Sequence, residues 1–170
     1  MSNRWFQNGP LCLVLGLVVG VVAGLNIKGY WPSIPLHATA THGQDNFAIA
    51  TGAVDDTTEA IYFLDFLTGD LRAAVIQPQM RKFNAFFTGN VLADFGPAQM
   101  KSPKFLMVTG NVDIPRTGGN VQFARSVIYV AEATTGQVAC YGIPWNPTFQ
   151  AQRRPQNGVF APVEKRKFRT

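Results

Sequence analysis

The chain has 170 residues, of which 46% are hydrophobic and 15% charged, and its formal net charge is +5. This length fits one domain rather than two, and the charged fraction lies below the roughly 25% of typical soluble domains. Glycine, proline and phenylalanine occur in short runs broken by turn residues, which argues against a helix-rich class.

The first element is an apolar segment, LCLVLGLVVGVVAGL, from Leu11 to Leu25. As a helix the segment is about 27 Å long from Pro10 to Ile27, close to the roughly 30 Å of a hydrocarbon core. Residues 1–28 therefore predict a signal anchor and transmembrane helix, with a cleaved signal peptide as the alternative. Three glycines favour the anchor, because their spacing puts them on one helix face where a second helix can pack closely. They are Gly16, Gly20 and Gly24.

The topology expected is a single pass with the β-rich part of the chain on the periplasmic or extracytoplasmic side. Short N-terminal signal anchors usually export the domain that comes after them, whereas Arg4 and Lys28 flank the span too evenly to set an orientation. Residues 29–46 predict an extended stalk, since Pro32 and Pro35 interrupt regular pairing.

The sequence then repeats itself, so residues 47–147 predict a β domain of two copies, 47–88 and 105–147. Each copy has an apolar strand running into Thr-Gly-x-Val-Asp, then a strand with Ile-Tyr, an acidic residue and a Thr-Gly turn. We expect a mainly β fold, a small antiparallel barrel or sandwich of seven or eight strands from two pseudo-repeats. Two copies are too few for a propeller.

Local signals add detail to this domain. Gly69 and Gly136 are expected to provide positive φ in hairpin turns. The strands 61–66 and 127–131 are almost wholly apolar, which predicts central strands covered on both faces. Residues 91–95 predict a short helical turn.

The basic charge is concentrated in residues 148–170, which are polar and proline-rich and predict a flexible tail. This segment alone has a net charge of +5, while residues 29–152 hold seven basic and nine acidic groups. We therefore expect the tail to contact anionic lipid or an acidic polymer, and nucleic acid is disfavoured as a partner. The tail's basic residues are Arg153, Arg154, Lys165, Arg166, Lys167 and Arg169.

Candidate chemistry is sparse. Asp65 and Glu132 occupy equivalent positions in the two copies. Sheet-edge or solvent-facing positions are the favoured interpretation for both, and a carboxylate pair lining a shared site is the alternative. Asp55 and Asp113 also recur, and capping of their own turns is the favoured interpretation. Cys140, in an apolar strand, predicts a small buried hydrophobic residue.

Other catalytic or binding patterns are missing from the sequence. His37, His42 and Asp45 lie in the predicted stalk without metal-ligand spacing. No catalytic triad, phosphate-binding glycine loop, Cys-x-x-Cys or dinucleotide fingerprint occurs. We therefore predict no catalytic residue, no cofactor and no metal. Four aromatic residues form either a binding surface or, as favoured, part of the core: Phe83, Phe86, Phe87 and Trp145.

Several strings resemble a family of short planctomycete proteins, membrane-anchored and exported, to which no activity is assigned. The strings are DNFAIATG, EAIYFLDFLTGDLRAAV, KFNAF, LMVTG, YVAE and PWN, within residues 30–147. The resemblance implies a lineage rather than a reaction. Family members end soon after Pro-Trp-Asn, so the basic segment is a departure.

Three functions remain open from the sequence. The first is a non-enzymatic, membrane-anchored envelope protein whose exported β domain is an interaction or assembly module, self-associating through the glycine face. The second is an accessory subunit of a larger membrane complex. The third is a small ligand-binding or enzymatic β domain that uses Asp65 and Glu132.

Overall fold

The computed structural model describes residues 14–20, 41–43, 45–96, 103–115 and 122–169. The chain divides into two compact units, 1–36 and 37–170. In the first unit, residues 14–20 are helical. Within the described ranges, no helix is both long enough and apolar enough to cross a membrane.

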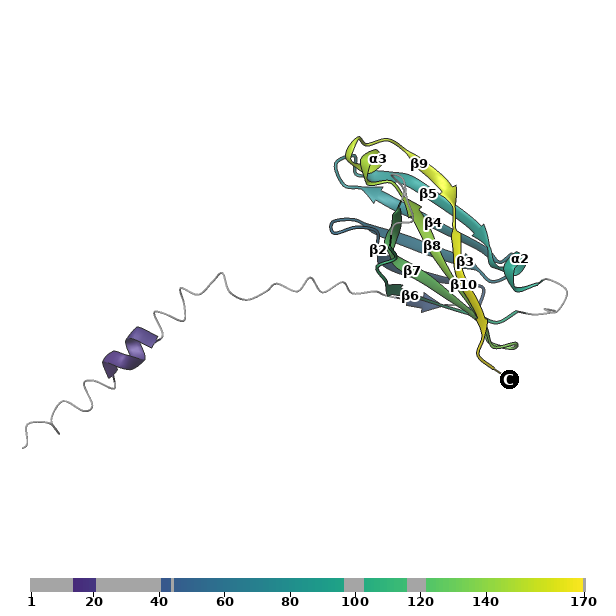
Figure 1. Ribbon diagram of the computed structural model, residues 1–170, viewed down its shortest axis with the longest axis horizontal. Helices are drawn as coiled ribbons and strands as arrows, with labels where there is room; N and C mark the ends of the chain where they lie inside the picture. Colours follow the sequence, from purple (N-terminus) through teal and green to yellow (C-terminus); the bar gives the residue numbers. More distant parts are fainter. Residues whose placement is uncertain (1–13, 21–40, 44, 97–102, 116–121, 170) are drawn as a thin grey trace, which may run out of the picture. The chain divides into compact units, whose positions relative to one another are not determined.

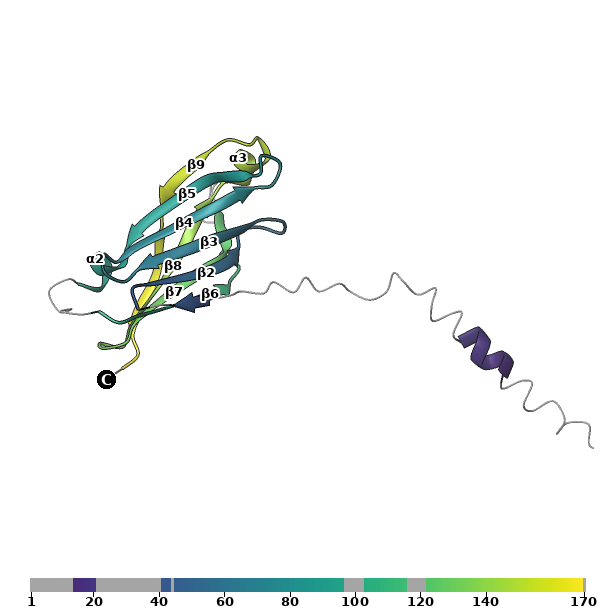
Figure 2. The ribbon, with the colours of Figure 1, turned by 180° about the vertical axis from the view of Figure 1, so that it is seen from behind.

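The second unit is built from two sheets, so the expectation of a mainly β fold is confirmed. The larger sheet has six strands in the order β1-β2-β3-β4-β5-β9 (Figures 1 and 2). All its neighbours are antiparallel except β5 and β9, which are parallel. The strands are β1 (Thr41–Gly43), β2 (Phe47–Ala53), β3 (Glu59–Asp65), β4 (Asp70–Gln77), β5 (Lys82–Asn90) and β9 (Gln156–Val159).

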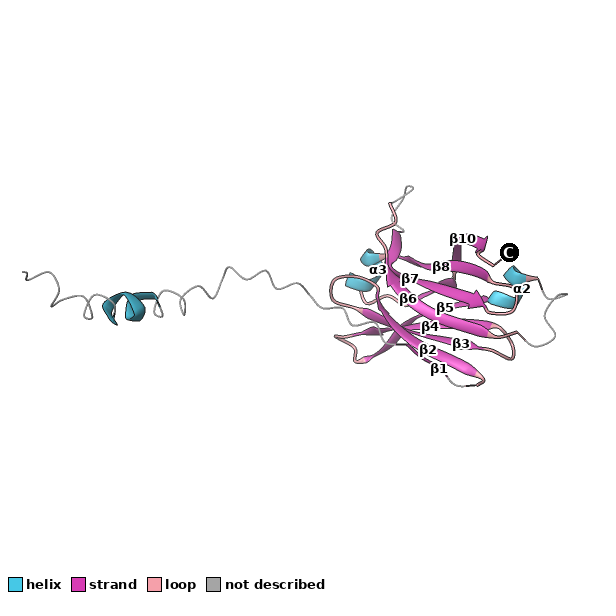
Figure 3. Ribbon diagram, turned by 90° about the horizontal axis from the view of Figure 1, so that it is seen from below, coloured by secondary structure: helices cyan, strands magenta, loops and turns pink. Residues whose placement is uncertain are grey.

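The smaller sheet has four antiparallel strands in the order β10-β8-β7-β6. Figure 3 shows the two sheets as separate layers, and they do not close into a barrel. The strands of this sheet are β6 (Phe105–Asn111), β7 (Gln122–Glu132), β8 (Gln137–Trp145) and β10 (Ala161–Lys167). With ten strands in the described ranges, the expected seven or eight is too few.

One hydrophobic core lies between the inner faces of the sheets. Tyr62 and Leu71 of the larger sheet and Ile128 and Trp145 of the smaller one are fully buried there. The Tyr62 hydroxyl lies 2.7 Å from the Ser126 Oγ, a buried hydrogen bond that joins the sheets. Such a bond removes the cost of burying two polar groups between apolar layers.

The hairpin turns follow the sequence expectation. Gly69 and Gly136 have φ of 71° and 68°, in the left-handed region that residues with a Cβ rarely adopt. The predicted helical turn is also confirmed, as α2 (Val91–Phe95), with the Asn90 side chain accepting a hydrogen bond from the Ala93 N–H.

The prediction of a flexible tail over residues 148–170 is wrong. Asn146 caps a short helix, α3 (Pro147–Ala151), and the chain continues into β9 and β10. β9 pairs with β5 in the larger sheet, and β10 pairs with β8 in the smaller one. Main-chain pairing holds β10 in the sheet, because none of its residues is fully buried. Hydrophobic periodicity therefore could not indicate this strand.

The expectation that the apolar strands are covered on both faces is also wrong for β3. Its residues alternate between buried and exposed, with Ile61 and Phe63 directed outward. An antiparallel sheet commonly has one face open to solvent, and in this protein apolar side chains lie on that face.

The structure predicts that Phe160 is essential to the stability of the domain. This residue is 6% exposed and its ring centroid lies 6.5 Å from that of Tyr62. Phe160→Ala should lower the free energy of unfolding of residues 37–170 by about 3 kcal/mol, measured by urea denaturation. The matched control is Phe168→Ala, because Phe168 is 73% exposed and should change stability little. Equal, small effects of the two substitutions would mean that the C-terminal segment is not part of the core.

Candidate functional site

The carboxylates of Asp65 and Glu132 both bind the turn that follows their own strand. Asp65 Oδ1 accepts hydrogen bonds from the Leu67 and Thr68 N–H groups at 2.8 and 3.2 Å. Glu132 accepts from the Thr134 and Thr135 N–H groups at 3.0 and 2.6 Å. The two residues are thus equivalent in structure, as the sequence suggested, but each works as a turn cap within its own hairpin.

The Glu132 carboxylate accepts more hydrogen bonds than the Asp65 carboxylate. It also accepts from the Thr135 hydroxyl at 2.7 Å and from the Lys104 N–H at 3.3 Å, and it has no exposed surface. Burial raises the pKa of Glu132, but these hydrogen bonds favour the ionised form and lower it to about 2. A carboxylate held ionised by four donors is poorly suited to act as a general acid or base. The geometry therefore gives no support to a shared acid–base site.

Asp55 and Asp113, the other repeated acids, line one cavity of about 460 Å³ together with Arg125. Asp55 Oδ1 accepts hydrogen bonds from the N–H and hydroxyl of Thr57 at 2.9 and 3.2 Å, so its expected turn-capping role is confirmed. Asp56 forms an ion pair with Arg125 at the same place. In the part of the chain that the structure describes, no three His, Cys, Asp or Glu residues are placed to hold a metal ion.

A second cavity, also of about 460 Å³, lies beside α2, and residues of β5, β9 and β10 line it. The Tyr141 hydroxyl donates to Asp94 Oδ2 at 2.8 Å, and the Lys165 ammonium donates to the Asp94 carbonyl at 2.7 Å. Burial and the Asp94 carboxylate raise the pKa of Tyr141, so its hydroxyl remains a donor. Sequence reasoning missed this pair, since residues 47 positions apart share no local motif.

Among the sulfur and histidine candidates, the structure describes the surroundings of Cys140. Cys140 is half-buried in an apolar cavity of about 370 Å³ on the smaller sheet, and burial raises the pKa of its thiol, which disfavours the nucleophilic thiolate. His42 is in β1, while His37 lies outside the described residues.

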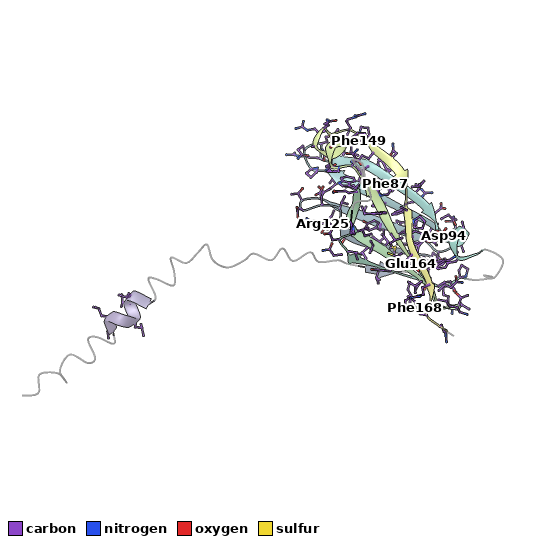
Figure 4. The ribbon with its side chains drawn as sticks, viewed as in Figure 1. Phe87, Asp94, Arg125, Phe149, Glu164 and Phe168 are labelled. Atoms are coloured by element: carbon purple, nitrogen blue, oxygen red, sulfur yellow. The ribbon has the colours of Figure 1, made fainter. Side chains whose placement is uncertain are left out.

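The basic residues of the C-terminal segment fall into two groups at opposite ends of the domain. Arg153 and Arg154 follow α3, whereas Lys165, Arg166 and Lys167 are on β10 and Arg169 follows it. Figure 4 labels Phe149 of α3 at one end of the domain and Phe168, next to Arg169, at the other. We call these the α3 end and the α2 end. The single basic surface expected from the sequence is therefore divided.

An apolar surface covers the outer face of the six-stranded sheet. Phe63 of β3 stacks on Phe47 of β2 with ring centroids 5.3 Å apart. Ile61 is paired with Ala74, and Ala74 with Phe86, so apolar side chains cross three strands in one row. Phe86 is 48% exposed and Phe83 is 51% exposed. We call this surface the outer apolar face, defined by Phe47, Ile61, Phe63, Ile76, Phe83 and Phe86.

The four candidate aromatics therefore divide between two roles. Phe87 and Trp145 are buried in the core, as expected. Phe83 and Phe86 belong to the outer apolar face, against the expectation of a core role. Alternation along β5 explains the split, because Phe86 and Phe87 are adjacent and must point to opposite faces.

The glycine candidates are described only in part. Gly16 and Gly20 lie in the helical residues 14–20, one turn apart, and added Cβ atoms would meet nothing within 4 Å. Gly24 lies outside the described residues.

Comparisons of the chain with protein-family models, curated proteins and solved structures found no match.

The Glu132 cap predicts a specific pH dependence of stability. The folded-state pKa of about 2 lies below the ordinary value of 4.5, so the stabilisation is complete above about pH 4.5 and is lost as the pH falls toward 2. Glu132→Gln should lower the free energy of unfolding at pH 7 by about 1–3 kcal/mol and flatten its fall in acid, measured by urea denaturation at several pH values. Glu164→Gln, at an exposed position on β10, serves as the control. An unchanged acid limb in Glu132→Gln would contradict this role.

Proposed function

We propose that this chain is a non-enzymatic, membrane-anchored envelope protein whose exported β domain is an assembly module that binds a second copy of the chain. The outer apolar face is the observation that carries the proposal. Contiguous exposed apolar surface is uncommon on monomeric proteins and marks sites of association.

The composition of this face favours a second copy over an unlike partner. Apolar side chains occupy its centre, and Arg72, within it, already forms an ion pair with Asp70 at 3.1 Å. Two such faces related by a twofold axis would bring aromatic and aliphatic groups together at the centre, while Glu59, exposed on the same face, lies at the start of β3. An accessory subunit of a mixed complex remains the second candidate, because the same face could bind another apolar surface.

Anchoring is supported by the N-terminal apolar segment. The described helical residues 14–20 are all apolar or glycine. We propose that residues 1–28 form a single-pass anchor with the domain on the extracytoplasmic side, and that Gly16, Gly20 and Gly24 pack against a second helix.

We also propose that the domain is a sandwich of two pseudo-repeats. The strands β2 to β5 pair in sequence, and β6, β7, β8 and β10 do the same in the second sheet. Asp65 and Glu132 cap matching turns, with Gly69 and Gly136 at matching positive-φ positions. The likeness to exported planctomycete proteins, proposed from the sequence strings, agrees with this location.

Self-assembly predicts a homo-oligomer of the full chain in mild detergent, measured as native mass. Phe63→Ser with Phe86→Ser should weaken the association at least tenfold, because both side chains lie in the centre of the outer apolar face. The control pair, Leu106→Ser with Val108→Ser, changes exposed residues of the other sheet and should have little effect. A monomer would contradict self-assembly, and a mixed complex would favour the accessory-subunit alternative.

Anchoring predicts that the full chain stays with the membrane after alkaline extraction, while a chain beginning at residue 37 is released. A periplasmic reporter fused after Thr170 should be active. A silent reporter, with the protein retained in the membrane, would reverse the orientation.

A further inference from the structure

We propose that the α3 end of the domain binds the anionic headgroup surface of a lipid bilayer. The contact is a cationic patch, defined as Arg81, Lys82, Arg153 and Arg154. The inference rests on the proposed function, because an anchored domain works within reach of a bilayer, and it names the part of the domain that faces the lipid.

The patch is assembled by the fold from two distant segments. Arg81 and Lys82 are at the turn between β4 and β5, and the Gln77 side chain beside them donates to the Gln150 carbonyl at 2.9 Å. The Asn84 side chain donates to the Arg153 carbonyl at 3.2 Å. These contacts hold the chain that follows α3 against the start of β5, so the segments that carry the four cations lie side by side.

Aromatic and aliphatic side chains accompany the cations. The Arg154 guanidinium lies 4.3 Å from the centre of the Phe149 ring. Met80, in the turn between β4 and β5, is half-buried. Basic groups with apolar neighbours suit the interface of an anionic bilayer, where the charge meets phosphate and the rings enter the headgroup layer.

Acidic groups also lie at this end, and three of them, Asp55, Asp56 and Asp113, line a cavity that Pro147 at the start of α3 lines too. Asp55 and Asp56 are in the loop after β2, and Glu59 begins β3, whereas β5 and β9 follow beyond β4. Asp56 is paired with Arg125, which Figure 4 labels on the smaller sheet. The α3 end is therefore basic at the start of β5 and in the chain after α3, and acidic around the cavity beside Pro147, so the proposed lipid contact is limited to the basic side of this end.

The direction of β1 agrees with this contact. β1 is antiparallel to β2, with Thr41 opposite Ala50 and Gly43 opposite Ala48. β2 runs toward the α3 end, so β1 runs away from it, and the chain enters the domain from that side. The 13 peptide links from Lys28 to Thr41 span at most about 45 Å, which keeps an anchored domain at high effective concentration near the surface.

The test uses residues 37–170, a compact unit that contains the whole described core. We expect it to co-sediment with vesicles of phosphatidylcholine mixed with phosphatidylglycerol, to lose binding as salt is raised, and not to bind phosphatidylcholine alone. Changing Arg81, Lys82, Arg153 and Arg154 together to Gln should reduce the partition coefficient more than a hundredfold, since each cation contributes about fivefold.

The matched control removes the same amount of charge from the other group. The control variant should reduce binding less than tenfold, because its residues contribute only to the long-range electrostatic potential of the domain. It changes four residues to Gln: Lys165, Arg166, Lys167 and Arg169. Circular dichroism of each variant confirms that it is folded.

Three results would overturn the inference: equal loss in the two four-residue variants, binding to phosphatidylcholine alone, or no binding to anionic vesicles by a folded domain. Any of these leaves the anchoring and self-assembly results unaffected, since those use the full chain. Conversely, release of the full chain by alkaline extraction would refute the anchor while vesicle binding by the domain still stood.

Discussion

The packing of the two sheets against each other depends on Phe160, where the C-terminal part of the chain crosses from one sheet to the other. β9 ends at Val159 in the six-stranded sheet and β10 begins at Ala161 in the four-stranded one. The single residue between them is buried against Tyr62, and its N–H donates to the Thr88 carbonyl at 3.0 Å. On the opposite side of the domain, the Thr109 hydroxyl donates to the Thr51 carbonyl at 2.6 Å. The sheets are therefore joined on both sides of one core.

This crossing also determines where the basic charge lies. A flexible tail would present all its cations together, whereas β9 and β10 hold Arg153 and Arg154 at the α3 end and Lys165 to Lys167 along a sheet edge. Charged residues on an edge strand discourage pairing with further strands, which fits β10. The outer apolar face, in contrast, is open, and the proposals assign self-association to that face and lipid contact to the α3 end.

Most of the local structure could be predicted from the sequence, because it depends on local signals. Thr68-Gly69 and Thr135-Gly136 indicated both hairpins, and residues 91–95 the helical turn. Asn146-Pro147 begins a helix, but prolines at this place are equally typical of a broken strand. β10 was missed since its residues are charged and its order comes from backbone pairing. The patch of Arg81, Lys82, Arg153 and Arg154 depends on contacts such as Gln77 with Gln150, which no spacing indicates.

Hydrogen exchange of the full chain, followed by mass spectrometry with and without anionic vesicles, tests the central claim most directly. The claim is that the C-terminal segment is part of the fold and presents only some of its cations to lipid. It predicts slow exchange over residues 156–167 in both conditions and added protection with vesicles over residues 78–84 and 149–154. Exchange of residues 156–167 at the rate of an unfolded chain, or added protection centred on residues 163–169, would contradict it.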